Sequence, residues 1–215
     1  MIIHQIFFDI GRGTLADKPG WIKNMNVNKA LNPSYRHILW DEEKAMTWIR
    51  EHYPQYVSLI ATFPAKFYLI DFFRYLVLTK MGGVYIDMDV RCKQKLPETD
   101  IILGGTYIKS DANNNVMKLT PELNQKLLDF CVAAYTRIRD NDMWVGKPGR
   151  RFLWSVGASM FAQFLRKNKI TSENNFREYF YDEAARSWIG GKGNIVEKGY
   201  RGAATLEGTI DDMLS

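Results

Sequence analysis

The stretch that decides how this chain is interpreted is residues 82–90, which read Gly82-Gly83-Val84-Tyr85-Ile86-Asp87-Met88-Asp89-Val90. A glycine pair commonly ends a helix, and the residues after it alternate in polarity with the period of a β-strand. The pattern therefore predicts one strand over 84–90, with its apolar side chains on one face and Tyr85, Asp87 and Asp89 on the other.

The two aspartates of this stretch are candidate metal ligands. Two carboxylates two positions apart on a strand lie about 6.6 Å apart along it, and both would be costly to keep ionised in a buried place. A divalent cation that prefers oxygen ligands, Mg²⁺ or Mn²⁺, relieves this cost and can hold a diphosphate as a leaving group. The alternative is that Asp87 and Asp89 only end the strand and cap neighbouring loops, and a lone D-x-D does not decide between the two.

The segment before the glycine pair, Phe67–Lys80, predicts a buried helix because its apolar residues occupy nearly every side. Asp71 and Arg74 are the exceptions, and their spacing of three puts them on one face of the helix. They either neutralise each other as a buried ion pair, or Asp71 accepts a hydrogen bond from a ribose hydroxyl while Arg74 holds it or contacts phosphate.

The rest of the chain alternates between strand and helix patterns. Short apolar runs predict strands over 2–8, 35–40 and 101–103, and a loop separates the first two over 11–20. Helices are predicted after the N-cap Asp41, over 54–63, after Thr120-Pro121, over 153–166 and over 173–188. This order predicts an α/β sandwich with a mixed, mainly parallel sheet flanked by helices.

At this point the chain resembles a known family. The helix carries D-x-x-R-Y at Asp71–Tyr75, and G-G-x-Y-x-D-x-D follows at Gly82–Asp89. Both resemble the DXD-containing sugar transferases of glycosyltransferase family 32, which include capsular polysaccharide-type enzymes and are related to the glucosylating clostridial toxins. The opening Ile2–Phe7 and the segment Asn32–Asp41 resemble the same family in matching order.

The resemblance implies a GT-A fold as a single domain over 1–215, with a donor part over about 1–110 and an acceptor or lid part over about 111–215. It implies metal-dependent transfer of a hexosyl group from a nucleoside diphosphate sugar, UDP-glucose first, to a hydroxyl of a saccharide or glycoprotein glycan, with retention of configuration. A mannosyltransferase that uses GDP-mannose is the first alternative. A metal-dependent nucleoside diphosphate sugar hydrolase and a non-catalytic sugar-binding module are the others.

The resemblance also implies roles for single residues. Asp89 would bind the metal directly and Asp87 partly through it, so that these two and Arg74 are the predicted catalytic residues. The predicted donor contacts in the first part of the chain are Phe7 on the base, Asp71, Arg74, Tyr85 and Asp87 around ribose and sugar, and Asn114 on the sugar. Phe7 stands where the family has tryptophan.

The C-terminal part carries fewer matching positions. Ser187-Trp188 resembles the S-W pair that closes over the diphosphate in the family, although Trp188 is equally well explained as a core or lid aromatic. Where the family has a histidine as a further metal ligand, this chain has Asp182 and Glu183. A carboxylate suits Mn²⁺ or Mg²⁺, so these two are the candidates for that position.

Composition limits the other classes of function. The net charge is +5, with denser basic clusters at 91–95 and 147–151 that are either solvated faces or patches for a diphosphate or anionic acceptor. No basic stripe is interleaved with aromatics, which argues against nucleic acid. The sequence shows neither a signal peptide nor an apolar run near the ~20 residues of a membrane span, so we expect a soluble, cytoplasmic chain, on its own or as one domain of a longer polypeptide.

Overall fold

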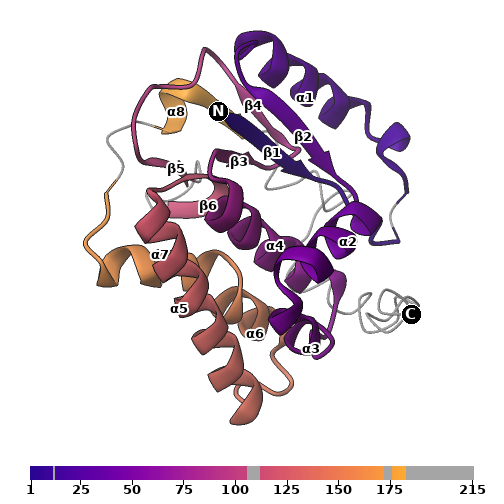
Figure 1. Ribbon diagram of the computed structural model, residues 1–215, viewed down its shortest axis with the longest axis vertical. Helices are drawn as coiled ribbons and strands as arrows, with labels where there is room; N and C mark the ends of the chain where they lie inside the picture. Colours follow the sequence, from indigo (N-terminus) through magenta and orange to yellow (C-terminus); the bar gives the residue numbers. More distant parts are fainter. Residues whose placement is uncertain (12, 106–111, 172–175, 183–215) are drawn as a thin grey trace.

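The computed structural model describes residues 1–11, 13–105, 112–171 and 176–182 (Figure 1). Its strands are β1 Ile2–Ile6, β2 Arg36–Trp40, β3 Val84–Ile86, β4 Val90–Cys92, β5 Ile102–Gly105, β6 Ala112–Lys118 and β7 Phe180–Asp182. Its α-helices are α1 Pro19–Leu31, α2 Glu42–His52, α3 Val57–Ile60, α4 Lys66–Met81, α5 Pro121–Asp140, α6 Pro148–Ser155, α7 Ala158–Lys167 and α8 Phe176–Tyr179. Two 3₁₀ turns cover Leu15–Asp17 and Pro54–Tyr56.

The centre of the molecule is a five-stranded sheet in the order β2-β1-β3-β6-β5. Strands β2, β1 and β3 are parallel to one another, whereas β3 pairs with β6 and β6 with β5 in antiparallel fashion. A separate antiparallel pair joins β4 to β7. The predicted α/β sandwich with a mixed sheet is therefore confirmed, with its parallel pairing confined to three neighbouring strands.

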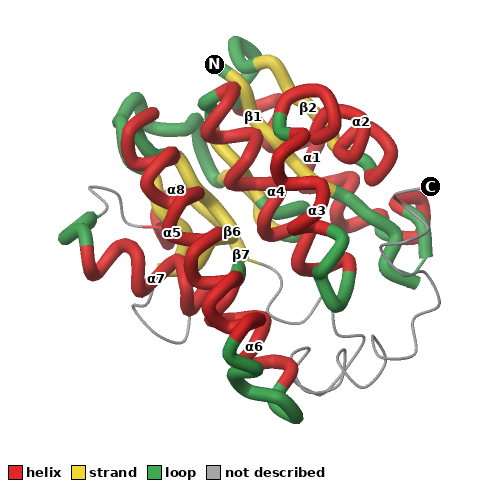
Figure 2. Tube along the Cα trace, turned by 60° about the horizontal axis from the view of Figure 1, so that its bottom comes forward, coloured by secondary structure: helices red, strands yellow, loops and turns green. Residues whose placement is uncertain are grey.

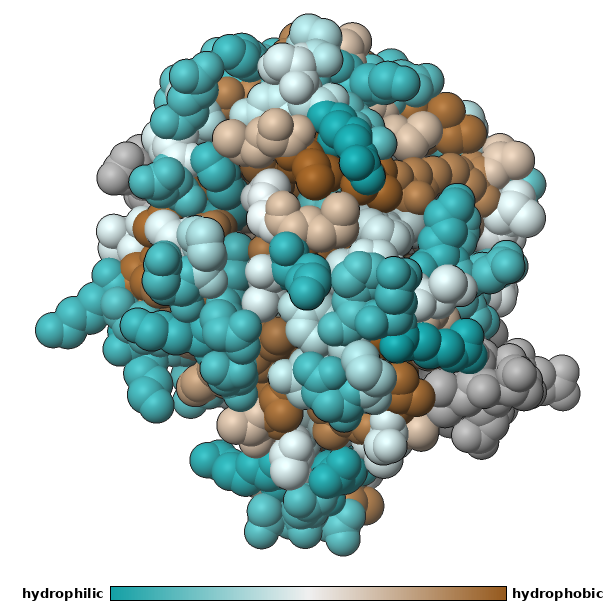
Figure 3. Space-filling model, viewed as in Figure 1, coloured by the Kyte–Doolittle hydropathy of each residue, from teal (hydrophilic) through white to brown (hydrophobic). Residues whose placement is uncertain are grey.

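Both faces of the sheet are covered. Tyr85 of β3 belongs to the larger core, which fills the space between the sheet and helices α2, α4, α5 and α7. Its neighbours Val84 and Ile86 belong to a second core with residues of β4 and β7. Figure 2 shows the helices crowded around strands that run through the middle of the molecule. In the view of Figure 3 the surface is mainly hydrophilic, and the hydrophobic areas are small and separated from one another by polar side chains.

Helix α4 is buried along most of its length, as the all-round apolar pattern predicts. It ends at Gly82, which has a φ of 63°, and Gly83 follows with a φ of 93°. A Cβ on Gly83 would lie 2.4 Å from the carbonyl oxygen of Ile2. The second glycine is therefore required for β3 to come alongside β1.

His4 fixes the same corner from the β1 side. Trp40 Nε1 donates to His4 Nδ1 at 3.1 Å, so His4 Nε2 carries the proton and donates to the Gly82 carbonyl at 2.9 Å. Burial lowers the pKa of His4 to about 4, and the ring is neutral at physiological pH. Both ring nitrogens are occupied, which leaves His4 with a structural role.

The prediction of one continuous strand over 84–90 is wrong. Strand β3 ends at Ile86, the chain turns through 87–89, and β4 begins at Val90 in the other sheet. The sequence alternates in polarity here, but Tyr85 and Asp89 are buried like the apolar residues between them, so the alternation does not separate a buried face from an exposed one. Consequently Asp87 and Asp89 lie on a turn and do not share one face of a strand with Tyr85.

Several other boundaries differ from the predictions. The predicted loop over 11–20 contains the Leu15–Asp17 turn and the start of α1, a helix that the sequence pattern missed. The predicted helix over 153–166 is two helices that meet at Val156-Gly157, and the segment 173–188 forms a short helix and then β7 within its described residues. The helix caps at Asp41 and Thr120 are confirmed by their hydrogen bonds to Lys44 N and Leu123 N.

Two further predictions concern the whole chain. Residues 106–111 lie outside the described part, so the division into donor and acceptor parts near residue 110 stays a prediction. Among the described residues, no helix is both long enough and apolar enough to cross a lipid bilayer.

Candidate functional site

The predicted site residues of the first half meet at one edge of the central sheet. Phe7 and Asp87 each come directly after the last residue of a strand, and these two strands, β1 and β3, are parallel neighbours. In α/β sheets, ligands bind in the crevice outside the carboxyl ends of such strands. Phe7 is half-buried here, and its ring packs edge-on against Trp21 at 5.9 Å between centroids.

Arg74 joins three elements at this edge. Its side chain, on α4, is only 4% exposed. Its Nη2 forms an ion pair with Asp71, whereas its Nη1 donates to the Asn114 carbonyl of β6 at 2.8 Å and lies 3.3 Å from Asp87 Oδ1. The guanidinium carbon also lies 4.4 Å from the centre of the Tyr85 ring.

A second set of hydrogen bonds closes the cluster. Asn114 Nδ2 donates to Asp71 Oδ2 at 3.3 Å and contacts the Tyr75 hydroxyl at 3.0 Å. The Tyr75 hydroxyl donates to the Val156 carbonyl at 2.7 Å, which ties the cluster to the junction of α6 and α7. Tyr75 is a site residue that the predictions missed, although it is the final position of the D-x-x-R-Y pattern.

The charges within this cluster are set by burial and by each other. Burial raises the pKa of Asp71 to about 6, although Arg74 acts in the opposite direction, so Asp71 is ionised at neutral pH. Burial alone would lower the pKa of Arg74, but Asp71, Tyr85 and Asp87 reverse this and raise it above its ordinary value. Arg74 is therefore permanently charged, and one cation serves two carboxylates.

Tyr85 keeps its proton in this environment. Burial raises the pKa of Tyr85 well above its ordinary value, and the hydroxyl donates a hydrogen bond to Asp87 Oδ1. The same oxygen of Asp87 thus faces both Tyr85 and Arg74. Its position is set by two side chains that sequence analysis had placed in the donor site.

The D-x-D segment itself is a tight turn. Val90 N donates to the Asp87 carbonyl at 3.0 Å, and Asp87 N donates to the Asn115 carbonyl of β6 at 2.8 Å. Asp89 is 5% exposed, whereas the side chain of Asp87 is 19% exposed. The backbone of the turn is therefore anchored at Asp87 by β6.

Helix α1 holds the chain on the other side of this turn. Asn24 Nδ2 donates to the Met88 carbonyl at 3.4 Å, and Asn28 Nδ2 donates to the Val90 carbonyl at 3.0 Å. The backbone N–H of Cys92 donates to Asn28 Oδ1 at 2.7 Å. One turn further along, Asn32 Oδ1 accepts from Leu96 N at 2.9 Å.

These asparagines were also missed by the predictions. Asn24, Asn28 and Asn32 are all buried and follow one another at intervals of four residues, the spacing that puts side chains on one helix face. That spacing in the sequence is the signal that could have identified them. We call the three residues the asparagine ladder.

The side-chain oxygens at the turn are of the type that divalent cations prefer as ligands. Carboxylate oxygens of Asp87 and Asp89 are ligands that Mg²⁺ and Mn²⁺ prefer. The described residues contain no group of three or more His, Cys, Asp or Glu side chains placed to hold a metal. A cation held by these two aspartates would need diphosphate oxygens, water or a further residue to complete its ligands.

Of Asp182, a predicted further metal ligand, the structure describes only the backbone. Strand β7 pairs with β4 so that Asp182 lies opposite Val90, the residue directly after Asp89. The backbone of Asp182 is therefore next to the turn. Its side chain, together with Glu183, Ser187 and Trp188, lies outside what the structure describes.

Residues 19–109 match the family described as the glycosyltransferase sugar-binding region containing a DXD motif. A mannosyl phosphorylinositol ceramide synthase of Saccharomyces cerevisiae is 39% identical over 66 residues, 31% of this chain and 17% of that protein. An inositol phosphoceramide mannosyltransferase of Schizosaccharomyces pombe is 34% identical over 95 residues, 44% of this chain and 26% of that protein. The chain thus matches about a quarter or less of the length of these two relatives.

A solved structure shares the fold. The PaToxG glycosyltransferase superposes with a TM-score of 0.51 over 77% of this chain and 68% of its own length, at 19% sequence identity. The GT-A type of fold is therefore confirmed. Residues 19–109 are therefore similar to the DXD-containing glycosyltransferase sugar-binding region, in agreement with the resemblance in the sequence.

Proposed function

We propose that the chain is the catalytic domain of a glycosyltransferase that binds a nucleoside diphosphate sugar at the edge formed by the ends of β1 and β3. The observation that carries this proposal is the cluster of Asp71, Arg74, Tyr85, Asp87 and Asn114, which converge from α4, β3 and β6 directly beside the D-x-D turn. A buried, charged cluster at the ligand-binding edge of an α/β sheet is typical of a functional site.

Within this proposal, Arg74 acts through its neighbours. Both of its Nη atoms contact protein groups, so we assign it the role of holding Asp71 and Asp87 in place and balancing their charge. Asp71, next to Asn114, is the proposed acceptor for a sugar or ribose hydroxyl. Phe7 is the proposed base-stacking residue because it lies half-buried at the same edge.

A Mn²⁺ or Mg²⁺ ion is the proposed cofactor, held by Asp89 and Asp87 with Asp182 or Glu183 as a further ligand. When bound, such an ion neutralises charge that grows on a departing diphosphate. The asparagine ladder and the Tyr85 hydroxyl would keep the two aspartates in position for it. Ser187 and Trp188 are the proposed residues that close over the diphosphate.

The identity of the donor sugar is a finer proposal. The relatives in yeasts are named as mannosyl-transferring enzymes, so we now favour GDP-mannose over the UDP-hexose that sequence analysis put first. Their names also contain an inositol phosphoceramide, so the acceptor hydroxyl is proposed to belong to a glycolipid or a glycan. Retention of the anomeric configuration stays a proposal drawn from the resemblance.

Thermal melting against nucleotides and nucleotide sugars tests the donor site. A ligand present at about a hundred times its Kd stabilises the folded state by about 2.7 kcal/mol, which corresponds to a rise in Tm of roughly 5–10 °C for a domain of this size. We expect this rise with GDP or GDP-mannose in the presence of Mn²⁺. If no nucleotide raises the Tm, with or without metal, the proposed donor site is wrong.

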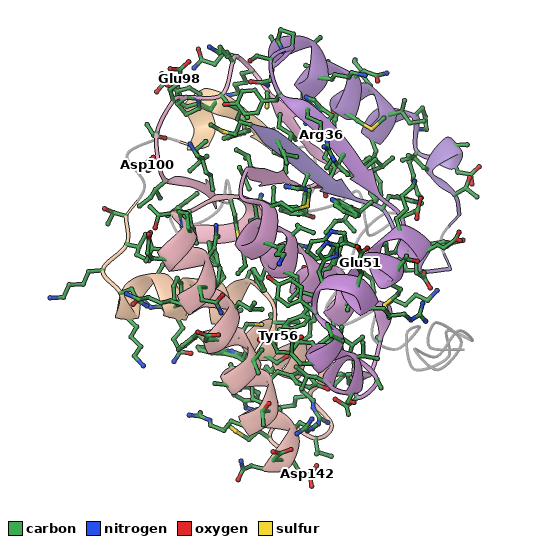
Figure 4. All side chains as sticks on the ribbon, viewed as in Figure 1. Arg36, Glu51, Tyr56, Glu98, Asp100 and Asp142 are labelled. Atoms are coloured by element: carbon green, nitrogen blue, oxygen red, sulfur yellow. The ribbon has the colours of Figure 1, made fainter. Side chains whose placement is uncertain are left out.

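Two substitutions make the test specific. Asp89→Asn should abolish the metal-dependent part of the rise, whereas Asp100→Asn, at an exposed position on the periphery of the molecule, should leave it unchanged (Figure 4). Equal rises in the two variants would exclude Asp89 as a metal ligand.

Product analysis separates transfer from the alternatives. Release of free hexose without transfer to any acceptor in a panel of glycans and inositol glycolipids would favour a nucleoside diphosphate sugar hydrolase. Binding of the donor with neither transfer nor release would favour a non-catalytic sugar-binding module.

A further inference from the structure

A groove lies between α5, α6, α7 and the 141–147 loop, with a volume of about 840 Å³. Its floor is apolar and aromatic, and the residues that form it are Phe130, Ala133, Ala134, Ile138, Met143, Trp144 and Trp154. The rings of Trp144 and Trp154 lie 6.1 Å apart. This groove lies outside the residues of the proposed donor site.

The rim of the groove is positively charged. Arg137, Arg166 and Lys167 line it and are exposed, and the described lining residues include no acid. None of the three forms an ion pair with a carboxylate of the described residues, in contrast to the nearby Arg139, whose Nε lies 2.6 Å from Asp140. Three cations beside an aromatic floor form a surface suited to an anionic, amphiphilic ligand.

The 141–147 loop at the end of the groove has an unusual backbone conformation and an exposed apolar side chain. Trp144 has a φ of 60°, a conformation that a bulky residue rarely adopts without a functional reason. The next residue, Val145, is 67% exposed, which makes it one of the few large apolar side chains on the described surface. Lys147 and Arg150 follow, also exposed, and belong to the basic cluster at 147–151.

The groove is separate from the candidate donor site. Helix α7 starts beside Val156, whose carbonyl accepts from Tyr75 in the donor cluster, whereas Arg166 and Lys167 are near the other end of the helix. Ten helical residues span about 15 Å. Figure 4 shows Asp142, at the start of the loop, at the lower extreme of the molecule.

We propose that this groove and loop dock the protein on a membrane surface that contains anionic lipids. Arg137, Arg166 and Lys167 face the lipid phosphates, and the exposed Val145, next to Trp144 at the groove, enters the boundary between headgroups and acyl chains. The loop carries the exposed Asp142 before the valine and tryptophan, and the exposed Lys147 after them. An exposed valine beside a tryptophan, next to a basic rim, fits this boundary better than it fits an acidic peptide, since a peptide offers no apolar layer. The proposal concerns a surface separate from the proposed donor site and does not depend on it.

Vesicle co-sedimentation of the full chain tests the proposal. We expect binding to phosphatidylcholine vesicles that contain about 30 mol% phosphatidylserine, and at least tenfold weaker binding to phosphatidylcholine alone. Each basic residue near an anionic surface contributes about fivefold to binding, so the triple variant Arg137→Gln/Arg166→Gln/Lys167→Gln should bind about a hundredfold more weakly.

A matched control removes the same charge elsewhere. Lys23→Gln/Lys29→Gln/Arg36→Gln changes three exposed residues of α1 and β2, far from the groove, and should alter binding by less than about threefold. Val145→Glu changes one exposed side chain without disturbing the core and should weaken binding about fivefold. Unchanged melting temperatures establish that all variants are folded.

Four outcomes would overturn the proposal. They are equal binding to neutral and anionic vesicles, equal losses in the two triple variants, displacement from vesicles by millimolar inorganic phosphate, and displacement by an acidic peptide of matched charge. The third would assign the groove to a free anion, and the fourth would assign it to a protein partner.

Discussion

Replacing Asn28 by alanine tests how the D-x-D turn is supported. The Asn28 side chain is 0% exposed and serves two backbone groups, the Val90 carbonyl at 3.0 Å and the Cys92 N–H at 2.7 Å. Alanine leaves both groups buried without a partner, at about 1–3 kcal/mol each. Alanine also favours the helix by about 0.5 kcal/mol, so we expect a net loss of about 2–5 kcal/mol in the free energy of unfolding.

The same helix provides graded controls. Asn24 makes one long hydrogen bond, 3.4 Å to the Met88 carbonyl, and its removal should cost about 0.5–1.5 kcal/mol. Asn26 is exposed on the opposite side of α1, so Asn26→Ala should change stability by less than about 0.5 kcal/mol. In urea unfolding, the loss of stability should therefore be largest for Asn28→Ala, smaller for Asn24→Ala and smallest for Asn26→Ala.

The functional consequence is measured separately. Because Asn28 fixes the chain just after Asp89, Asn28→Ala should also raise the Mn²⁺ concentration that gives half of the nucleotide-dependent rise in Tm, by about tenfold. The comparison with Asn26→Ala removes effects common to any change in α1. If Asn28→Ala and Asn26→Ala differ by less than about 1 kcal/mol, the ladder does not support the turn and the reasoning fails.

Three further predictions follow from the same region. Gly83→Ala should cost more than about 3 kcal/mol because its Cβ would lie 2.4 Å from a carbonyl oxygen at a φ of 93°, whereas Gly82→Ala meets open space and should cost about 1–3 kcal/mol from backbone strain alone, at a φ of 63° and a ψ of −155°; equal urea midpoints would contradict this. Burial lowers the pKa of His4 from 6.5 to about 4, so the unfolded state takes up a proton that the folded state does not, and the contribution of His4 to the free energy of unfolding should fall by about 2–3 kcal/mol between about pH 7 and pH 4.5. This contribution is measured as the difference between wild type and His4→Gln, because the raised pKa of Asp71 acts in the opposite direction over the same range. An identical pH dependence in His4→Gln would show that another group is responsible. Asp182→Asn should weaken Mn²⁺ binding at least about tenfold while Glu178→Gln, exposed on α8, leaves it unchanged, and an unaffected Asp182→Asn would exclude Asp182 as a ligand.

The parts of the fold that could be predicted from the sequence are those in which one signal dominates. Helix α4 is apolar on nearly every side and ends in two glycines, so its burial and its end at Met81 follow from composition alone. Asp71 and Arg74 contact each other because three positions along a helix share a face. The contact with Asn114 could not be predicted this way, since it joins residues 40 positions apart on different elements.

Helix α1 does not follow from the sequence pattern because, apart from Trp21, its buried side is made of amide side chains. The sequence signal of a helix is an apolar residue at every third or fourth position, whereas α1 buries Asn24 and Asn28 at such positions. Asparagine is also a weak helix former, so propensity gave no help. Such a helix is stabilised by the hydrogen bonds it makes to another segment, and those are visible only once β4 is in place.

The error over 84–90 has the same origin and bears on function. Alternating polarity predicts one buried and one exposed face, yet Tyr85 is as buried as its neighbours Val84 and Ile86. A true strand would have held Asp87 and Asp89 by its own ladder of hydrogen bonds. A turn between two sheets has no such ladder, so the position of Asp89 depends on β6 on one side and on α1 on the other. The geometry of the proposed metal site is therefore set by residues distant in sequence, and substitutions in α1 should affect metal binding without touching either aspartate.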